Sequence, residues 1–145
     1  MAYRFIPEDE GIANTIKKLL ELEGFVCVDA QTAKAEDVSD KVKKEIENSD
    51  GVVVIFTKVK QLSNGKWTTS SWLNDEKAFA LGKNKPILLF FEDCIDPDER
   101  KGIHGELEYL PFNRDKMDEF ILRAIPYIRD FYKKVLEFKG LSVCF

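Results

Sequence analysis

The chain has 145 residues, of which 44% are hydrophobic and 33% charged, and its formal net charge is −4. This length suits one domain with a core that needs no disulfide or metal, and the negative charge gives no bulk attraction to nucleic acid or to an anionic membrane. The cysteines, Cys27, Cys94 and Cys144, are far apart and form no CxxC pair, so neither a disulfide framework nor a zinc site is indicated. No signal-peptide core or membrane-length apolar run is present, and we expect a cytoplasmic protein with reduced thiols.

Strand and helix patterns alternate along the first part of the chain. In order, the patterns predict a strand at residues 3–6, an acidic turn at 8–11, a helix at 12–23, a strand at 25–28, a loop at 30–36 and a helix from near Asp37 to residue 47. Pro7 ends the first of these strands, and Gly24 is placed to end the first helix.

The same alternation continues to the end of the chain. The patterns predict a strand at residues 52–56, a polar stretch at 58–69, a helix at 70–81, a strand at 86–91, a loop at 92–106, a strand at 109–112 and a long helix at 117–138. Ser71 is the expected N-cap of the third helix, and Pro126 should kink the last helix or split it in two.

This order of elements predicts an α/β fold, a five-stranded parallel sheet flanked by helices on both faces in a three-layer sandwich. Residues 52–56 are apolar without alternation, which indicates a strand covered on both faces at the centre of the sheet. Ligands of such sheets bind outside the carboxyl ends of the strands, where the strand order reverses. We therefore expect a site formed by residues 7–11, 29–36, 57–71 and the start of the helix that contains Trp72.

A carboxylate lies on the apolar stripe of that helix. The stripe has the i, i+4, i+7 and i+8 spacing of one helix face and consists of Trp72, Glu76, Phe79 and Ala80. An ionised carboxylate is costly to remove from water, so Glu76 is paired, lies at the rim of a cleft, or takes part in chemistry. The alternative is that Glu76 reaches solvent from the edge of the stripe.

Several common chemistries lack their residues. The chain has no GxxxxGK[ST] loop, no GxGxxG after its first strand, and one histidine, His104, in a loop where it reads as a surface residue. The strand at 52–56 ends in Phe56 and Thr57 rather than in the acceptor Asp of a phosphate receiver. What remains is a lone carboxylate, which can stabilise the oxocarbenium-like state formed when an N-glycosidic bond breaks. The nicotinamide of NAD is already cationic and leaves without being protonated.

The segment from Trp72 through Glu76 to Ala80 resembles the W-x-x-x-E-x-x-x-A motif of Toll/interleukin-1 receptor (TIR) domains, and residues 82–87 resemble the strand approach that follows it. The resemblance covers most of the chain and implies a TIR-like domain at residues 1–139, with 140–145 as a tail or the start of a truncated region. The chain differs from the family where Pro7 replaces a Ser and where the loop at 30–37 lacks a Gly.

The resemblance also implies roles for individual residues. Glu76 is similar to the catalytic Glu of the TIR domains that cleave NAD, and Trp72 would help to wall the pocket. The implied contacts with the nicotinamide or ribose, and with the neighbouring loop, are made by Ile6, Pro7, Asp29 and Lys34. Each has a structural alternative: Trp72 can be core, Asp29 a turn residue and Lys34 a solvated charge. No metal or cofactor is implied, because NAD is the substrate.

The implied function is a TIR-like NAD glycohydrolase that is activated by self-association in signalling or immune defence. Its expected partners are NAD or a related nucleotide, other copies through TIR–TIR contacts, and other proteins of a signalling complex. Two alternatives stay open. The chain can be a non-catalytic TIR-like interaction or nucleotide-sensing module, or an enzyme similar to nucleoside deoxyribosyltransferases.

Overall fold

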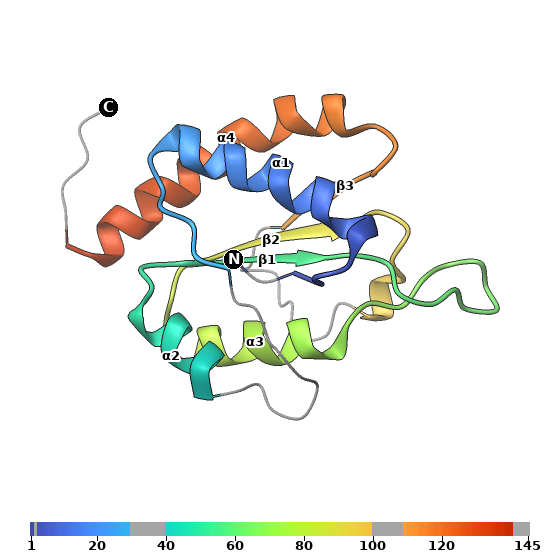
Figure 1. Ribbon diagram of the computed structural model, residues 1–145, viewed down its shortest axis with the longest axis horizontal. Helices are drawn as coiled ribbons and strands as arrows, with labels where there is room; N and C mark the ends of the chain where they lie inside the picture. Colours follow the sequence, from blue (N-terminus) through green and yellow to red (C-terminus); the bar gives the residue numbers. More distant parts are fainter. Residues whose placement is uncertain (2, 30–39, 100–108, 141–145) are drawn as a thin grey trace.

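The computed structural model describes residues 1, 3–29, 40–99 and 109–140. Its sheet consists of three parallel strands in the order β1-β2-β3, namely Val52–Phe56 (β1), Ile87–Glu92 (β2) and Tyr109–Phe112 (β3). The described helices are Pro7–Glu23 (α1), Asp40–Asn48 (α2), Ser71–Gly82 (α3) and Met117–Phe138 (α4), with a 3-10 turn at Pro97–Glu99 (η1). Helices α1 and α4 cover one face of the sheet, and α2 and α3 cover the other (Figure 1).

The predicted five-stranded sheet is wrong, because the described residues form a sheet of three strands. Residues 3–6 and 25–28 were the two other predicted strands, and neither pairs as a strand. The apolar residues 25–28 are buried only at alternate positions, since Phe25 and Cys27 pack partly against the core while Val26 is 92% exposed. Side-chain pattern indicates which face is buried, but it does not supply a backbone partner, and a strand requires both.

The shorter sheet also changes the position of β1. The strand is an edge of the described sheet, and the central strand is β2. The three strands follow one another in sequence order, so the described sheet contains no reversal of strand order. The rule that predicts a ligand site at such a reversal therefore has no basis in this sheet.

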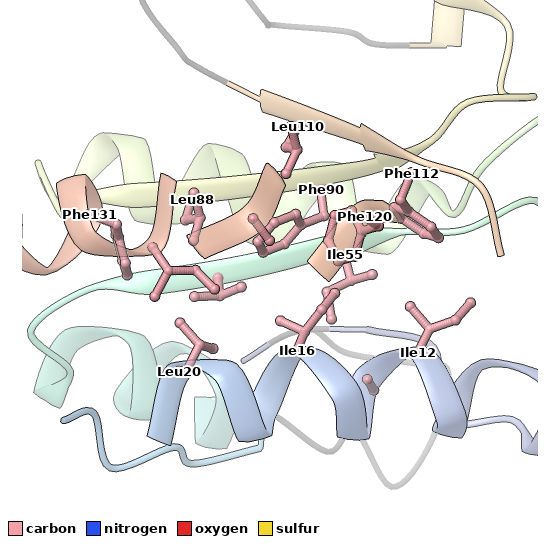
Figure 2. Packing of buried hydrophobic residues seen from close by; sticks show 14 of the residues in the cluster. Ile12, Ile16, Leu20, Ile55, Leu88, Phe90, Leu110, Phe112, Phe120 and Phe131 are labelled. Carbon is pink, nitrogen blue, oxygen red and sulfur yellow. The ribbon is translucent and has the colours of Figure 1, made fainter. Parts of the chain in front are cut away.

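All five residues of β1 are buried, as a strand between two helical layers requires. Alternate side chains belong to different cores. Val53 and Ile55 pack with α1 and α4, in the core that Figure 2 shows, whereas the side chains on the opposite face pack with α2 and α3. Figure 2 also shows Ile12, Ile16 and Leu20 of α1 directed toward the sheet. These three residues, which recur at helical spacing, thus form the predicted apolar face of α1.

The first helix starts earlier than predicted. Residues 8–11 form its first turns instead of an acidic turn, and the helix begins at Pro7. Proline is favourable at this position because it lacks an N–H that would be unpaired there, and acidic residues in a first turn interact well with the helix dipole. The predicted end is confirmed, since Gly24 adopts φ 117° and its N–H bonds to carbonyls of the last turn.

The other described helices lie near their predicted positions. Helix α3 is capped by Ser70 rather than by Ser71. Helix α4 is continuous from Met117 to Phe138 with Pro126 inside it, and Figure 1 shows it bending, so of the two predicted outcomes the helix shows the kink and not the split.

Among the described helices, none has the length and apolar composition needed to cross a membrane.

Gly51 sits immediately before β1 and is in close contact with α4. A Cβ at this position would lie 2.8 Å from Cζ of Phe131 and 2.9 Å from Cγ2 of Val135. We therefore expect Gly51→Ala to destabilise the fold by about 1–3 kcal/mol, because the ring and the methyl group must shift. Urea denaturation measures this change in the free energy of unfolding.

The matched control is Gly11→Ala in α1, where an added Cβ has nothing within 4 Å. Alanine is the better residue inside a helix, so this variant should gain about 0.5–1 kcal/mol. Equal stability of the two variants would contradict the packing of α4 on Gly51.

Candidate functional site

Helix α3 presents a mixed face to the sheet. Its buried residues are Leu73, Glu76, Lys77 and Ala80. The predicted stripe is correct for Glu76 and Ala80 and wrong for Trp72, whose side chain is 45% exposed. Leu73 takes the place expected of Trp72, one residue further round the helix. Apolar residues occur on several sides of α3, so its sequence did not define one face.

Glu76 is the unusual member of this face. The residue is 4% exposed, and within the described part of the chain its Oε2 atom has no hydrogen-bond partner. Burial raises the pKa of Glu76 to about 7, an effect that the Met1 ammonium opposes and the Asp75 carboxylate increases. Near neutral pH this side chain therefore exists in both its protonated and its ionised form.

Two other carboxylates share this electrostatic environment. Asp29 and Glu45 act together with Glu76 on the Met1 ammonium. Burial lowers the pKa of this ammonium group, and the three acids raise it. Asp29 Oδ1 and Glu45 Oε2 are also buried and have no hydrogen-bond partner in the described residues. The other oxygen of Asp29 lies 3.5 Å from Lys17 Nζ. This region therefore has more negative than positive charge.

The remaining predicted site residues lie at separate positions. Ile6 is the N-cap of α1 and Pro7 its first residue, while the Trp72 side chain is half-exposed. Within the described residues, no side-chain hydrogen bond or ion pair is found between any of these three and Glu76. The predicted position of Lys34 lies outside the described residues, as does that of His104.

A cavity of about 480 Å³ lies at the start of β1, and neither Trp72 nor Glu76 lines it. The cavity is bounded by the segment after α1, the start of β1 and the second half of α4. The predicted pocket beside the Trp72 indole is therefore not this cavity.

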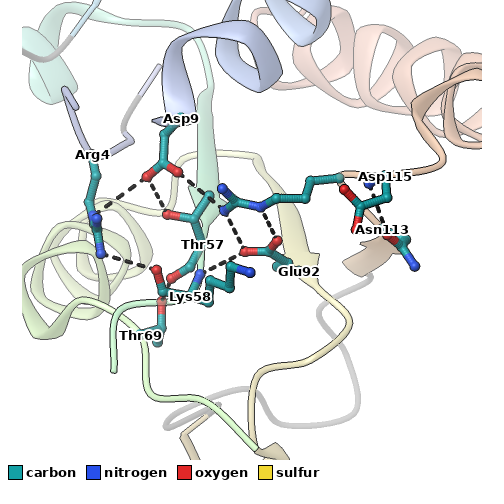
Figure 3. Close-up of polar contacts among 9 residues, drawn as sticks. Arg4, Asp9, Thr57, Lys58, Thr69, Glu92, Asn113 and Asp115 are labelled. Carbon is teal, nitrogen blue, oxygen red and sulfur yellow. Dashed lines mark hydrogen bonds and ion pairs between the residues drawn. The ribbon is translucent and has the colours of Figure 1, made fainter. Parts of the chain in front are cut away.

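A polar cluster lies at the carboxyl ends of β1 and β2 (Figure 3). Asp9 of α1 accepts a hydrogen bond of 2.7 Å from Thr57 Oγ1 and lies 3.2 Å from Arg114 Nη2. The same guanidinium group donates through Nε and Nη2 to the two carboxylate oxygens of Glu92. Arg4 adds a second guanidinium group 3.5 Å from Asp9. We call these five residues the carboxyl-edge cluster.

The charges of the carboxyl-edge cluster balance one another. Its two carboxylates, Asp9 and Glu92, are each 2% exposed. The backbone N–H of Lys58 also donates to Glu92 at 2.8 Å, and the hydrogen bonds to Glu92 are the main cause of a raised pKa of Arg114. Buried carboxylates with this many partners hold their elements in place. The cluster thus joins α1, β1, β2 and the loop after β3.

The carboxyl-edge cluster is not among the predicted sites, although the sequence contains a signal for it. Glu92 directly follows a fully apolar strand, and Arg114 follows the next strand by two residues. Opposite charges at the ends of neighbouring parallel strands are expected to meet at one edge of a sheet. Because a loop is predicted from residue 92 onward, the contact between Glu92 and Arg114 is not predicted.

The sequence matches no protein-family model, and the comparison with curated proteins finds no match. Within the described residues, no group of His, Cys, Asp and Glu side chains is arranged to hold a metal ion. The candidate functional group is therefore Glu76 itself, and its chemistry is that of a buried carboxyl group with a proton that exchanges near neutrality.

Removing Arg114 should be costly. In Arg114→Gln, the buried carboxylates of Asp9 and Glu92 lose their main counter-ion, and breaking such a pair from one side costs about 3–5 kcal/mol. Chemical denaturation should show this loss at pH 7. Arg123→Gln is the control, because Arg123 is exposed and donates a single hydrogen bond of 3.3 Å to the Pro111 carbonyl. A similar loss in both variants would rule out a special role for the cluster.

The pKa of Glu76 predicts a pH effect on stability. Its value is about 7 in the folded chain and 4.5 for the free side chain, so between these values the folded state keeps a proton that the unfolded state releases. The free energy of unfolding therefore falls as pH rises. Between pH 5 and pH 8 the wild type should lose about 2 kcal/mol relative to Glu76→Gln, which has no proton to release.

Urea titrations of both chains at the two pH values test this prediction. Glu137→Gln is the control, because Glu137 is exposed on α4 and should leave the pH dependence of the wild type unchanged. Parallel pH profiles for Glu76→Gln and the wild type would show that the Glu76 carboxyl group is solvated.

Proposed function

We propose that this chain is an NAD glycohydrolase, which cleaves the bond between nicotinamide and ribose, and that Glu76 is its catalytic carboxylate. The observation that carries the proposal is the state of Glu76, a side chain 4% exposed with a buried oxygen that lacks a partner in the described residues. The resemblance of the segment from Trp72 to Ala80 to the motif of NAD-cleaving TIR domains supports the choice of substrate.

The electrostatics of Glu76 suit this reaction. A carboxylate removed from water is destabilised, and it regains stability when a positive charge arrives beside it. NAD brings a cationic nicotinamide ring, and positive charge moves to the ribose as the glycosidic bond breaks. In a dry site this interaction strengthens toward the transition state, which is the requirement for catalysis.

The proposed reaction needs one carboxylate and one water molecule. The electron pair of the C–N bond leaves with nicotinamide, which becomes neutral and requires no proton. The ionised Glu76 stabilises the ribosyl cation and orients its hydroxyl groups. Water then adds to the anomeric carbon and gives a proton to the carboxylate or to solvent, so the products are ADP-ribose, nicotinamide and a proton.

We include activation by self-association in the proposal. Glu76 does not line the 480 Å³ cavity, and Trp72, the nearest large side chain of the motif, is half-exposed. A neighbouring copy that covers the Trp72 side of α3 would remove more water from Glu76 and supply the missing walls of a pocket. The rate per molecule would then rise with protein concentration.

The second candidate is a non-catalytic interaction module. It is favoured by the separation of the predicted site residues and by the carboxyl-edge cluster, whose charges are paired with one another at the carboxyl end of the sheet. On this alternative the chain consumes no NAD even when concentrated, and Glu76 affects stability alone.

The test is nicotinamide release from NAD at a series of protein concentrations. We expect Glu76→Gln to lower kcat by about a hundredfold or more, because the amide keeps the shape but cannot carry the charge that stabilises the cation. Glu137→Gln is the control, since Glu137 is an exposed acid on α4. The wild-type rate should increase as pH rises through about 7, when Glu76 ionises.

Three results would count against the proposal. Equal, non-zero rates in the wild type and Glu76→Gln would remove Glu76 from the mechanism. No NAD loss at any concentration would favour the interaction module. Exchange of bases between nucleosides without NAD loss would favour the deoxyribosyltransferase alternative.

A further inference from the structure

The 480 Å³ cavity is a feature of the fold that Glu76 does not explain. Its volume lies in the range of small-molecule sites, and its walls are mainly apolar. Leu20 of α1 and Phe131 of α4, which Figure 2 shows on opposite sides of the core, both line the cavity. Ile46 and Val53 close it from α2 and β1.

One wall of the cavity is aromatic. The Phe25 ring lies 5.4 Å from the Phe131 ring and 5.1 Å from the Tyr132 ring, edge to face with the latter. All three residues line the cavity. Aromatic rings in such an arrangement present both faces and edges, and they pack well against another aromatic or a cationic group.

The polar groups at the cavity give it a charge preference. Glu45 lines the cavity, and its Oε2 atom is buried without a hydrogen-bond partner in the described residues. The Met1 ammonium also lines the cavity and donates to the Val28 carbonyl at 2.6 Å. Asp50 and Lys139, at the cavity wall, form an ion pair of 3.3 Å, so their charges cancel. The Met1 ammonium interacts electrostatically with Glu45, but Glu45 Oε2 still lacks a hydrogen-bond donor within the described residues.

We propose that this cavity binds a small organic cation with an aromatic or apolar body, whose N–H group donates to Glu45. The apolar body replaces water against the walls from α1, β1 and α4, and the cation supplies the hydrogen bond that Glu45 Oε2 lacks. Glu76 does not line this cavity, but the Met1 residue that does line it carries an ammonium group that interacts electrostatically with both Glu45 and Glu76. The proposal does not depend on the proposed NAD chemistry.

Cys27 offers a direct readout, because this half-buried thiol lines the cavity. Cys94 is a matched internal control. It is also half-buried, burial also raises the pKa of its thiol, and it does not line the cavity. The experiment uses the full chain carrying Cys144→Ser. Mass spectrometry measures the rate at which iodoacetamide labels each of the two remaining thiols, at increasing concentrations of 4-phenylbutylamine.

We expect 4-phenylbutylamine to slow labelling of Cys27 in a saturable way and to leave Cys94 unchanged. Glu45→Gln should weaken the protection by the amine about tenfold, as expected for the loss of a hydrogen bond to a charged group. It should not affect the weaker protection by neutral 4-phenyl-2-butanone, which has no hydrogen-bond donor. Glu76→Gln should retain full protection, which separates this site from the proposed function.

Three outcomes would overturn the proposal. The first is that the amine does not protect Cys27. The second is that it protects Cys94 to the same extent, which would show non-specific binding. Protection that is lost in Glu76→Gln and kept in Glu45→Gln would place the cation at Glu76 instead of in the cavity.

Discussion

The ion pair between Arg114 and the buried carboxylates of Asp9 and Glu92 is the contact on which the arrangement of the fold depends. It joins a residue of the first helix to the end of the central strand and to the loop after the last strand, across 105 positions of sequence. A three-stranded sheet has few ladder hydrogen bonds, so side-chain contacts must fix how the surrounding helices sit on it. The carboxyl-edge cluster does so at one end of the sheet, and the two apolar cores do so on its faces.

Glu76 presents the opposite situation within the same molecule. Asp9 and Glu92 are as buried as Glu76, but they have counter-ions and hydrogen bonds, whereas Glu76 has a buried oxygen without a partner in the described residues. Folding alone would favour an apolar residue or a paired carboxylate at this position. A carboxyl group that is kept dry and unpaired lowers stability above its pKa, and this cost is understandable where a positive charge arrives during function.

Much of the fold could be predicted from periodicity, because burial leaves a direct trace in the sequence. The uninterrupted apolar runs predicted as strands at residues 52–56 and 86–91 correspond to the buried strands β1 and β2, and the residues at helical spacing from Ile12 to Leu20 form the core face of α1. Strands at residues 3–6 and 25–28 could not be decided in this way. Apolar residues in these segments pack partly against the core, and the backbone pairing that would make the segments strands depends on distant residues.

The candidate site shows the same limit for side chains. The sequence places Glu76 on an apolar stripe, and that stripe is buried, but Trp72 and Leu73 are adjacent and both apolar, so spacing alone could not decide which of them faces the sheet. The half-exposed indole follows from the choice of Leu73. An exposed tryptophan one turn before a buried, unpaired carboxylate leaves α3 with an apolar surface next to its charged interior. A second molecule that covers this surface would have two effects at once. It would bury the indole, and it would remove the remaining water from the carboxyl group.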